Sequence, residues 1–257
     1  MAQNMQNVSG QYSLQFEIMR IYDIHSHILP SVDDGPSDFS ETIEIVDLCE
    51  QQGISLIVAT PHRKDVSEFK LLPILEEKIR NVNNYLENKQ FDLRVLLGME
   101  NHLDFKLMDD IKNGSALTIN ESKYILVEMP YIDSLGPFKK YFEALIESEY
   151  VPVIAHPERM SMFIKDPSLL WEFASQDVIV QVTAGSLYGR FGREVERFTK
   201  TIIRSDYRVV IASDTHMSKE PRDQDLATGF RHAVSLVGQR KAREMVSDLP
   251  FKILSDD

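Results

Sequence analysis

Five of the seven histidines in the chain stand, together with acidic residues, at the ends of short apolar runs. His25 and His27 form a His-x-His pair, and Asp214 and His216 form a similar pair near the other end of the chain. Residues two apart on a strand point to the same face, so both members of such a pair could reach one ion. The candidate ligands are His25, His27, His62, Glu100, Glu128, His156, Asp214 and His216.

The mixture of imidazoles and carboxylates indicates a transition-metal site. Neutral imidazole with carboxylate suits zinc, manganese or iron better than calcium. So many ionisable side chains in one cleft would repel one another or lack partners unless cations organised them. They exceed the needs of one ion, so we expect two or three divalent ions, with Glu100 as a possible bridge. Two close cations can lower the pKa of a bridging water and supply hydroxide for attack on phosphorus.

Each of these residues alone has a simpler interpretation. One His-x-His pair is more often structural than functional, and His62 could cap a helix. Glu100 or Glu128 could be a solvated strand end with an ion-pair partner. The shared position at strand ends favours a metal site over these alternatives. The remaining histidines lack that position, so we expect His232 on a helix surface and leave His102 open.

Alternating apolar and amphipathic segments must position these side chains. The strand candidates are 19–25, 54–60, 92–100, 124–129, 151–156, 178–183 and 208–213. Helical patterns cover 39–52, 68–89, 137–149, 168–175, 194–205 and 225–246. The strands are rich in Val, Ile and Leu without strict alternation, as in parallel strands buried on both faces. The pattern predicts an α/β barrel, whose carboxyl strand ends share the face where such barrels build active sites.

Composition limits the classes of partner. The chain has 257 residues and a formal net charge of −12, which disfavours nucleic acid and anionic membranes as binding partners. Residues 1–17 are polar and are expected to form a flexible extension ahead of a single domain at 18–257. The only cysteine, Cys49, suits a reducing compartment, so we expect a cytoplasmic protein.

Several longer stretches extend this pattern: DIHSHILPSVDDG (23–35), ATPHR (59–63), GME (98–100), HPER (156–159), QVTAGSLYGRFG (181–192) and SDTH (213–216). They resemble the polymerase-and-histidinol-phosphatase (PHP) superfamily. More narrowly, they resemble its bacterial capsule and exopolysaccharide protein-tyrosine phosphatases of the CpsB/YwqE type. The resemblance runs from about Tyr22 to Pro221. It implies a distorted (β/α)7 TIM-like barrel with a trinuclear centre, commonly of manganese or iron.

The resemblance also implies roles for individual residues. It adds Asp34 to the ligands named above, with Asp33 as the alternative. It makes Arg159 a phosphate-binding arginine, although a surface arginine paired with Glu158 is the simpler alternative. A second such arginine would be Arg222, with Lys219 as the alternative. Asp214 and His216 would act in catalysis as well as in metal binding.

Two residues depart from the pattern of the family. Ser31 stands where glycine is common, which affects the conformation of the loop rather than the ligands. Arg63 stands where many members have a second histidine, but the ligand His62 is retained.

The implied function is hydrolysis of phosphotyrosine. The implied partner is a membrane-associated bacterial tyrosine kinase with a tyrosine-rich tail. One alternative is another PHP phosphoesterase, a histidinol-phosphate or nucleotide phosphatase, although the LPSVDDG and TAGS motifs disfavour histidinol phosphate. A second alternative is a non-catalytic, metal-binding regulatory module. A cysteine-dependent tyrosine phosphatase is excluded, because Ser55 stands where the Cys-x5-Arg motif starting at Cys49 needs arginine.

Overall fold

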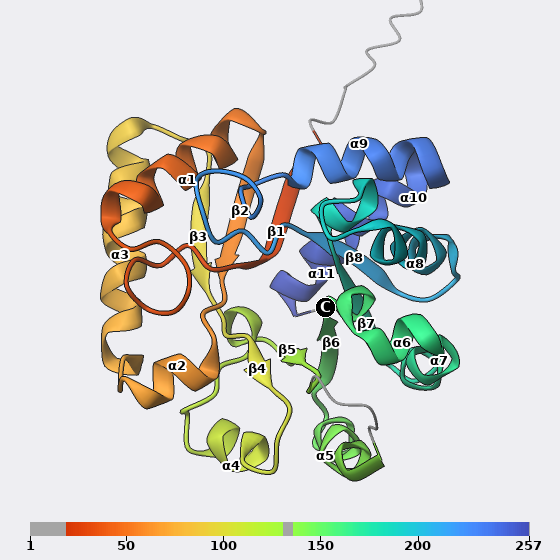
Figure 1. Ribbon diagram of the computed structural model, residues 1–257. Helices are drawn as coiled ribbons and strands as arrows, with labels where there is room; N and C mark the ends of the chain where they lie inside the picture. The colour runs from red at the N-terminus through yellow and green to blue at the C-terminus, as the bar shows by residue number, and fades with distance from the viewer. Residues whose placement is uncertain (1–18, 131–135, 257) are drawn as a thin grey trace, which may run out of the picture.

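Parallel strands form the frame of the protein. The computed structural model describes residues 19–130 and 136–256, so the expected extension at 1–17 lies outside the described residues. The first sheet has the order β1-β2-β3, and the second runs in sequence order from β4 to β8 (Figure 1). The strands are β1 (Ile21–Ser26), β2 (Ile54–Ala59), β3 (Arg94–Leu97), β4 (Asn101–His102), β5 (Tyr124–Glu128), β6 (Val151–Ala155), β7 (Ile179–Thr183) and β8 (Val209–Ala212).

Backbone hydrogen bonds beyond the strands join the two sheets into a barrel. On one side, the amide of His27 donates to the carbonyl of Thr215 at 2.8 Å. On the same side, the amide of Asp214 donates to the carbonyl of His25 at 2.9 Å. On the other side, the amide of Arg63 donates to the carbonyl of Glu100 at 2.9 Å. The expected distorted α/β barrel is confirmed, and its seams run through the segments that carry the candidate ligands.

The predicted strand at 92–100 is interrupted. Its first part is β3, its continuation is β4, and Glu100 lies in the break between them. The amide of Glu100 donates to the carbonyl of Pro61 at 3.1 Å, outside the regular ladder between β2 and β3. The interruption therefore lies where the chain leaves one sheet and enters the other.

Helices cover the outside of the barrel, apart from α11, which lies at its centre. They are α1 (Phe39–Gln51), α2 (Arg63–Glu68), α3 (Leu72–Lys89), α4 (Leu107–Lys112), α5 (Gly136–Glu147), α6 (Ser161–Lys165), α7 (Ser168–Ala174), α8 (Arg193–Arg204), α9 (Leu226–Val237), α10 (Gln239–Arg243) and α11 (Leu249–Ser255). Short single-turn segments are η1 (Ile119–Glu121), η2 (Pro157–Arg159), η3 (Ala184–Tyr188) and η4 (Glu244–Asp248).

Two predicted helices are wrong in their extent. The one at 68–89 begins only at Leu72, as α3, because Lys70 has a left-handed φ of 53° and separates this helix from α2. The one at 225–246 breaks at Gly238, whose φ is 82°. Both angles interrupt the run of helical hydrogen bonds. The start of α1 agrees with expectation, since the Asp38 carboxylate accepts from the amide of Glu41 at 3.1 Å.

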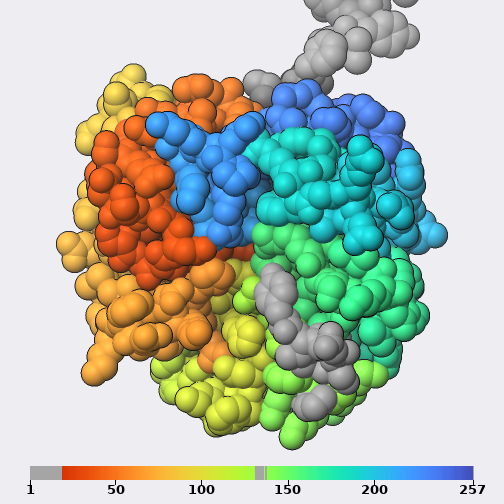
Figure 2. All heavy atoms as spheres, in the orientation of Figure 1, coloured from red at the N-terminus to blue at the C-terminus, as the bar shows by residue number. Residues whose placement is uncertain are grey.

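The apolar core has two parts. A large outer part fills the space between strands and helices. A smaller part lies inside the barrel, where Ile24, Val153 and Val210 pack with Leu249 and Ile253 of α11. Figure 1 shows α11 at the centre of the ring of strands, and Figure 2 shows the face of the molecule toward the viewer in that orientation. Among the described helices, none is long and apolar enough to cross a membrane.

Candidate metal centre

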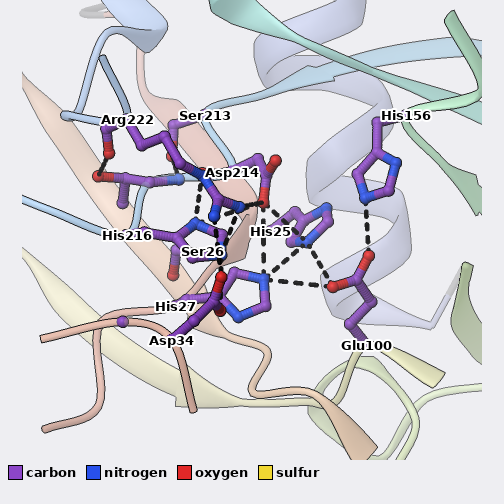
Figure 3. Close-up of polar contacts among 12 residues, drawn as sticks. His25, Ser26, His27, Asp34, Glu100, His156, Ser213, Asp214, His216 and Arg222 are labelled. Carbon is purple, nitrogen blue, oxygen red and sulfur yellow. Dashed lines mark hydrogen bonds and ion pairs between the residues drawn. The ribbon is translucent and has the colours of Figure 1, made fainter. Parts of the chain in front are cut away.

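Four side chains from distant segments converge at the carboxyl ends of the strands (Figure 3). The Nε2 atoms of His25 and His27 lie 3.2 Å apart. Glu100 Oε2 lies 3.5 Å from the first nitrogen and 3.3 Å from the second. Asp214 Oδ1 lies 3.4 and 3.5 Å from the same two atoms. All four residues are buried. Two ring nitrogens and two carboxylate oxygens thus share one small space away from solvent.

The partners of the other ring nitrogens fix the tautomers of this histidine pair. His25 Nδ1 lies 2.9 Å from Gln181 Oε1, and His27 Nδ1 lies 2.7 Å from Asp33 Oδ2. The Gln181 oxygen also accepts from the amide of His156, which fixes the orientation of the glutamine side chain. Because these oxygens only accept, each Nδ1 carries the hydrogen in the neutral ring. Both Nε2 atoms then present lone pairs to each other.

That arrangement fits a bound cation. Asp214 Oδ1 is also buried without a hydrogen-bond partner in the described part of the chain, and Glu100 Oε2 is buried with His62 Nδ1 2.9 Å away. Buried carboxylate oxygens that lack partners are costly, and facing lone pairs repel. A divalent cation among these atoms would remove both penalties. Hydrogen bonds from Nδ1 to acceptors are the usual way in which proteins orient metal-binding histidines.

A second group of possible ligands lies beside the first. It consists of His27, Asp34, His62 and His216, whose ligand atoms all lie within 4.8 Å of one another. Asp34 Oδ1 is 3.4 Å from His62 Nε2 and 3.1 Å from His216 Nε2. Asp33 instead is turned toward His27 Nδ1 and the amide of His62. The geometry therefore favours Asp34 as a ligand and Asp33 as the residue that orients His27.

A third group consists of His62, Glu100 and Glu128. It borders a cavity of about 370 Å³, which is also lined by His102. His102 Nδ1 lies 3.5 Å from Glu128 Oε2, so the histidine left open by the sequence lies next to the site. The other Glu100 oxygen, Oε1, lies 2.8 Å from His156 Nε2. The structure thus brings all nine expected ligands into one connected cluster, with Glu100 at its centre.

Two of these residues have an unusual backbone conformation. His156 has a φ of 33° and Asp214 has a φ of 54°, in the left-handed region that non-glycine residues seldom adopt. Such strain persists only where the surroundings enforce it, and it is common at functional sites. Nearby, Gly35 is required for a different reason, since a Cβ atom there would lie 2.2 Å from the carbonyl oxygen of His27.

The two expected arginines lie against acidic members of the cluster. Arg159 Nη2 is 2.8 Å from Asp214 Oδ2. The alternative pairing with Glu158 is wrong, because Glu158 is buried and accepts from the Thr183 amide and the Ser186 hydroxyl. Arg222 Nη1 is 2.9 Å from Asp34 Oδ2, and its Nη2 is 2.5 Å from His216 Nε2.

The structure also distinguishes Arg222 from its alternative. Lys219 is exposed on the same loop, whereas the guanidinium of Arg222 contacts the cluster directly. Of these two residues, it is Arg222 that reaches the cluster.

The departures from the family pattern have local consequences. Ser31 has a left-handed φ of 55°, and its hydroxyl donates to the carbonyl of Ser37 at 2.6 Å. A hydrogen bond thus holds a conformation that glycine would adopt without strain. Arg63 is turned away from the ligands and donates to Asp104 at 2.7 Å and to the carbonyl of His102 at 2.8 Å.

The charges of the cluster shift its titration strongly. Burial opposes the charged form of His27, but the Asp33 carboxylate outweighs it and raises the pKa of His27 to about 9. Burial likewise opposes protonation of His62, but hydrogen bonds to Asp34 and Glu100 raise its pKa to about 11. Burial and the charge of His27 lower the pKa of His216 to about 4. Without cations, protons therefore neutralise part of the cluster.

Sequence reasoning missed Gln181 and the orienting role of Asp33. A signal existed for Gln181, since it is the one amide in the otherwise apolar run VIVQVT. It is fully buried, and a buried polar side chain needs partners. Asp23, which also precedes the histidines, lies outside the cluster and accepts from the Ser213 amide at 3.1 Å and from Gln224 Nε2 at 2.9 Å.

Fold and site together define an α/β barrel protein with a His, Asp and Glu cluster that could hold metal. The family model for capsular polysaccharide synthesis proteins, CpsB/CapC, matches residues 21–255. The chain therefore belongs to the CpsB/CapC family.

Named relatives agree with this family. The tyrosine-protein phosphatase YwqE of Bacillus subtilis is 35% identical over 198 residues, which cover 77% of this chain and 78% of the relative. The putative tyrosine-protein phosphatase CapC of Staphylococcus aureus is 34% identical and covers 76% of both chains. A crystal structure from work on YwqE and on CpsB of Streptococcus pneumoniae, described as metal-dependent tyrosine phosphatases, superimposes with a TM-score of 0.82 at 29% identity. The match covers 92% of this chain and 95% of the other.

The raised histidine pKa values predict that metal loading releases protons. With pKa values of about 9 and 11, His27 and His62 are protonated at pH 7 in the metal-free protein. Metal ions need the lone pairs, so loading at pH 7 should release protons, and affinity should fall as the pH is lowered. Titration calorimetry of manganese into the metal-free protein, in buffers of different ionisation enthalpy, measures this release. A heat independent of the buffer would contradict the assignment.

Proposed function

We propose that this chain is a metal-dependent protein-tyrosine phosphatase. The convergence of the His25 and His27 lone pairs with two buried carboxylate oxygens supports metal binding more strongly than any other observation. Two guanidinium groups on the rim of the same cluster add sites for phosphate. Membership in the family and the names of the relatives supply the substrate, phosphotyrosine.

The metal ligands that we propose are His25, His27, Asp34, His62, Glu100, Glu128, His156, Asp214 and His216. The three overlapping groups of ligand atoms support two or three divalent ions. Manganese is the ion that we propose first, with iron or zinc as alternatives of similar ligand preference. When bound, such ions supply an activated nucleophile and neutralise phosphate oxygens.

The remaining roles follow from the positions of the charged groups. Arg159 and Arg222 each offer two donors in one plane, which match two oxygens of a phosphate. Asp214 holds the guanidinium of Arg159 at 2.8 Å and so directs it toward the cluster. The low pKa of His216 keeps this ring neutral at pH 7, which suits a ligand rather than an acid. Tyrosine leaves as a phenolate, a good leaving group, so strong acid catalysis is unnecessary.

We further propose that the physiological substrate is a phosphotyrosyl protein, in particular a membrane-associated bacterial tyrosine kinase with a tyrosine-rich tail. The family description, capsular polysaccharide synthesis, supports this choice. Such a tail would be reached in the cytoplasm, where we propose that the protein acts.

Phosphatase activity should depend on metal and not on the thiol. Removal of metal by a chelator should abolish hydrolysis of a phosphotyrosyl peptide, and manganese should restore it. Alkylation with iodoacetamide should leave activity intact, because Cys49 is fully buried and burial raises its pKa. Release of inorganic phosphate is the measurement, with a phosphoseryl peptide as the control. Turnover that survives complete chelation, or that alkylation of Cys49 abolishes, would contradict the proposal.

Substitution of Arg159 should separate phosphate binding from metal binding. Arg159→Lys keeps the charge but loses the planar pair of donors, and Arg159→Ala loses both. We expect kcat/KM to fall in the order wild type, Lys, Ala, with a loss of about 2–4 kcal/mol in transition-state stabilisation for Ala. Metal content should stay normal in both variants.

Arg231→Ala, on the exposed face of α9, is the matched control and should change neither kcat/KM nor metal content. If Arg159→Ala retains kcat/KM within about twofold of the wild type, Arg159 does not bind the phosphate.

A further inference from the structure

Arg190 makes an unusual set of contacts outside the metal cluster. Its Nη1 donates to the carbonyl oxygen of Pro221 at 3.2 Å and pairs with Asp223, and its Nη2 lies 3.3 Å from Glu220 Oε1. Its Nε lies 3.7 Å from Asp225 Oδ2. The guanidinium of Arg190 thus contacts the loop both before and after Arg222. Figure 2 shows the blue segment after β8 against the turquoise segment near residue 190.

The surroundings of Arg190 are built to hold this side chain. The Tyr188 hydroxyl donates to Asp225 Oδ2 at 2.6 Å, which keeps the carboxylate beside the guanidinium. Gly185 leaves the space for both, since a Cβ atom there would lie 2.9 Å from Arg190 Cδ and 2.9 Å from Asp225 Oδ2. The side chain of Arg190 is only 16% exposed, so solvent screens these ion pairs less than on an open surface.

The loop that Arg190 contacts, residues 220–225, carries Arg222, whose side chain reaches the cluster. The carbonyl oxygen of Arg222 accepts from the amides of His216 and Met217 at 2.9 and 3.1 Å, which closes a turn. Its side chain reaches Asp34 and His216. The position of the Arg222 guanidinium therefore depends on the position of this loop.

The next residue along the chain, Phe191, contacts the other arginine. The Arg159 guanidinium carbon lies over the Phe191 ring, 5.2 Å from its centroid. Contact with an aromatic face favours a cation and limits its orientations. Phe191 is half-buried, in the segment that joins η3 to α8. Of two consecutive residues, Arg190 thus contacts the loop that carries Arg222, and Phe191 contacts Arg159 directly.

We propose that Arg190 and Phe191 are positioning residues that set the two phosphate-binding guanidiniums, Arg190 acting through the loop of Arg222 and Phe191 acting on Arg159. The inference rests on the proposed phosphatase function, because it assigns both arginines to phosphate. Neither positioning residue contacts the metal cluster in the described structure. Their substitution should therefore change phosphate binding and leave metal content unchanged.

Two conservative variants test the proposal. Arg190→Lys keeps the charge among Glu220, Asp223 and Asp225 but cannot span both sides of the loop. Phe191→Leu keeps the apolar bulk and removes the aromatic face. Each should lower both kcat/KM on a phosphotyrosyl peptide and affinity for inorganic phosphate by about fivefold to tenfold, within the range of coupled neighbours. Arg190→Lys also avoids the unpaired acids that an alanine would leave.

The controls match each change at the far side of the barrel. Arg208→Lys alters an arginine that pairs with Asp177 at the amino end of β8. Phe251→Leu alters an exposed ring of α11 that lies 6.0 Å from the Tyr22 ring. Both should leave phosphate affinity and kcat/KM within about twofold of the wild type, as for surface changes remote from a site.

Double-mutant cycles distinguish positioning from general destabilisation. Arg190→Lys should cost nothing further in an Arg222→Ala background and keep its full cost in an Arg159→Ala background. Phe191→Leu should show the reverse pattern. Equal costs in both backgrounds, or no effect of either variant on the wild type, would overturn the proposal, because interaction energies arise only between coupled residues.

Measuring the affinity for inorganic phosphate tests the roles of Arg190 and Phe191 independently of the proposed phosphatase activity. Affinity of the manganese-loaded protein for inorganic phosphate, measured by calorimetry, needs no turnover. Wild-type protein that binds phosphate but hydrolyses no phosphotyrosyl peptide would refute the proposed activity, and the cycles on phosphate affinity would still decide the roles of Arg190 and Phe191. Wild-type protein that binds no phosphate would overturn the inference itself.

Discussion

The Nε2 atoms of His25 and His27 face each other across 3.2 Å, and much of the structure around them serves to keep them there. Gln181 and Asp33 hold the opposite ring nitrogens, so neither imidazole can rotate away without losing a buried hydrogen bond. Without a cation, protons have to neutralise part of this buried set of imidazoles and carboxylates, as the raised pKa of His27 indicates. A shared cation turns the same arrangement into a favourable one, which explains why the barrel brings these groups together.

The barrel provides this convergence from segments that are far apart in the sequence. Glu100 lies in a break between two strands, and His156 and Asp214 adopt left-handed backbone conformations where their strands end. These irregular positions occur where each chain segment leaves the sheet. The regular, apolar part of the barrel, closed inside by Ile253 of α11, supplies the rigidity that such strained ends need.

The sequence predicted the frame of the barrel and the convergence of the candidate side chains, for a definite reason. Buried parallel strands are short apolar runs, and a histidine or carboxylate at the end of such a run stands out. The choice between Asp33 and Asp34 depends on the direction of two adjacent side chains in one loop, which only the structure shows. Arg190 contacts partners 30 or more residues away in the sequence, so no local pattern marks it, whereas the single amide in the run VIVQVT was the one local sign of Gln181. Two helix boundaries shifted for a different reason, the left-handed backbone at Lys70 and Gly238.

The central claim is that this cluster holds several ions, and counting them tests it most directly. Native mass spectrometry of the protein, loaded with manganese and freed of excess metal, should find two or three ions per chain. His27→Ala should bind fewer, because it removes a ligand atom from two of the three groups. Glu44→Ala, an exposed acid on α1, should bind as many as the wild type. A wild-type protein without bound metal, or full occupancy in His27→Ala, would contradict this account.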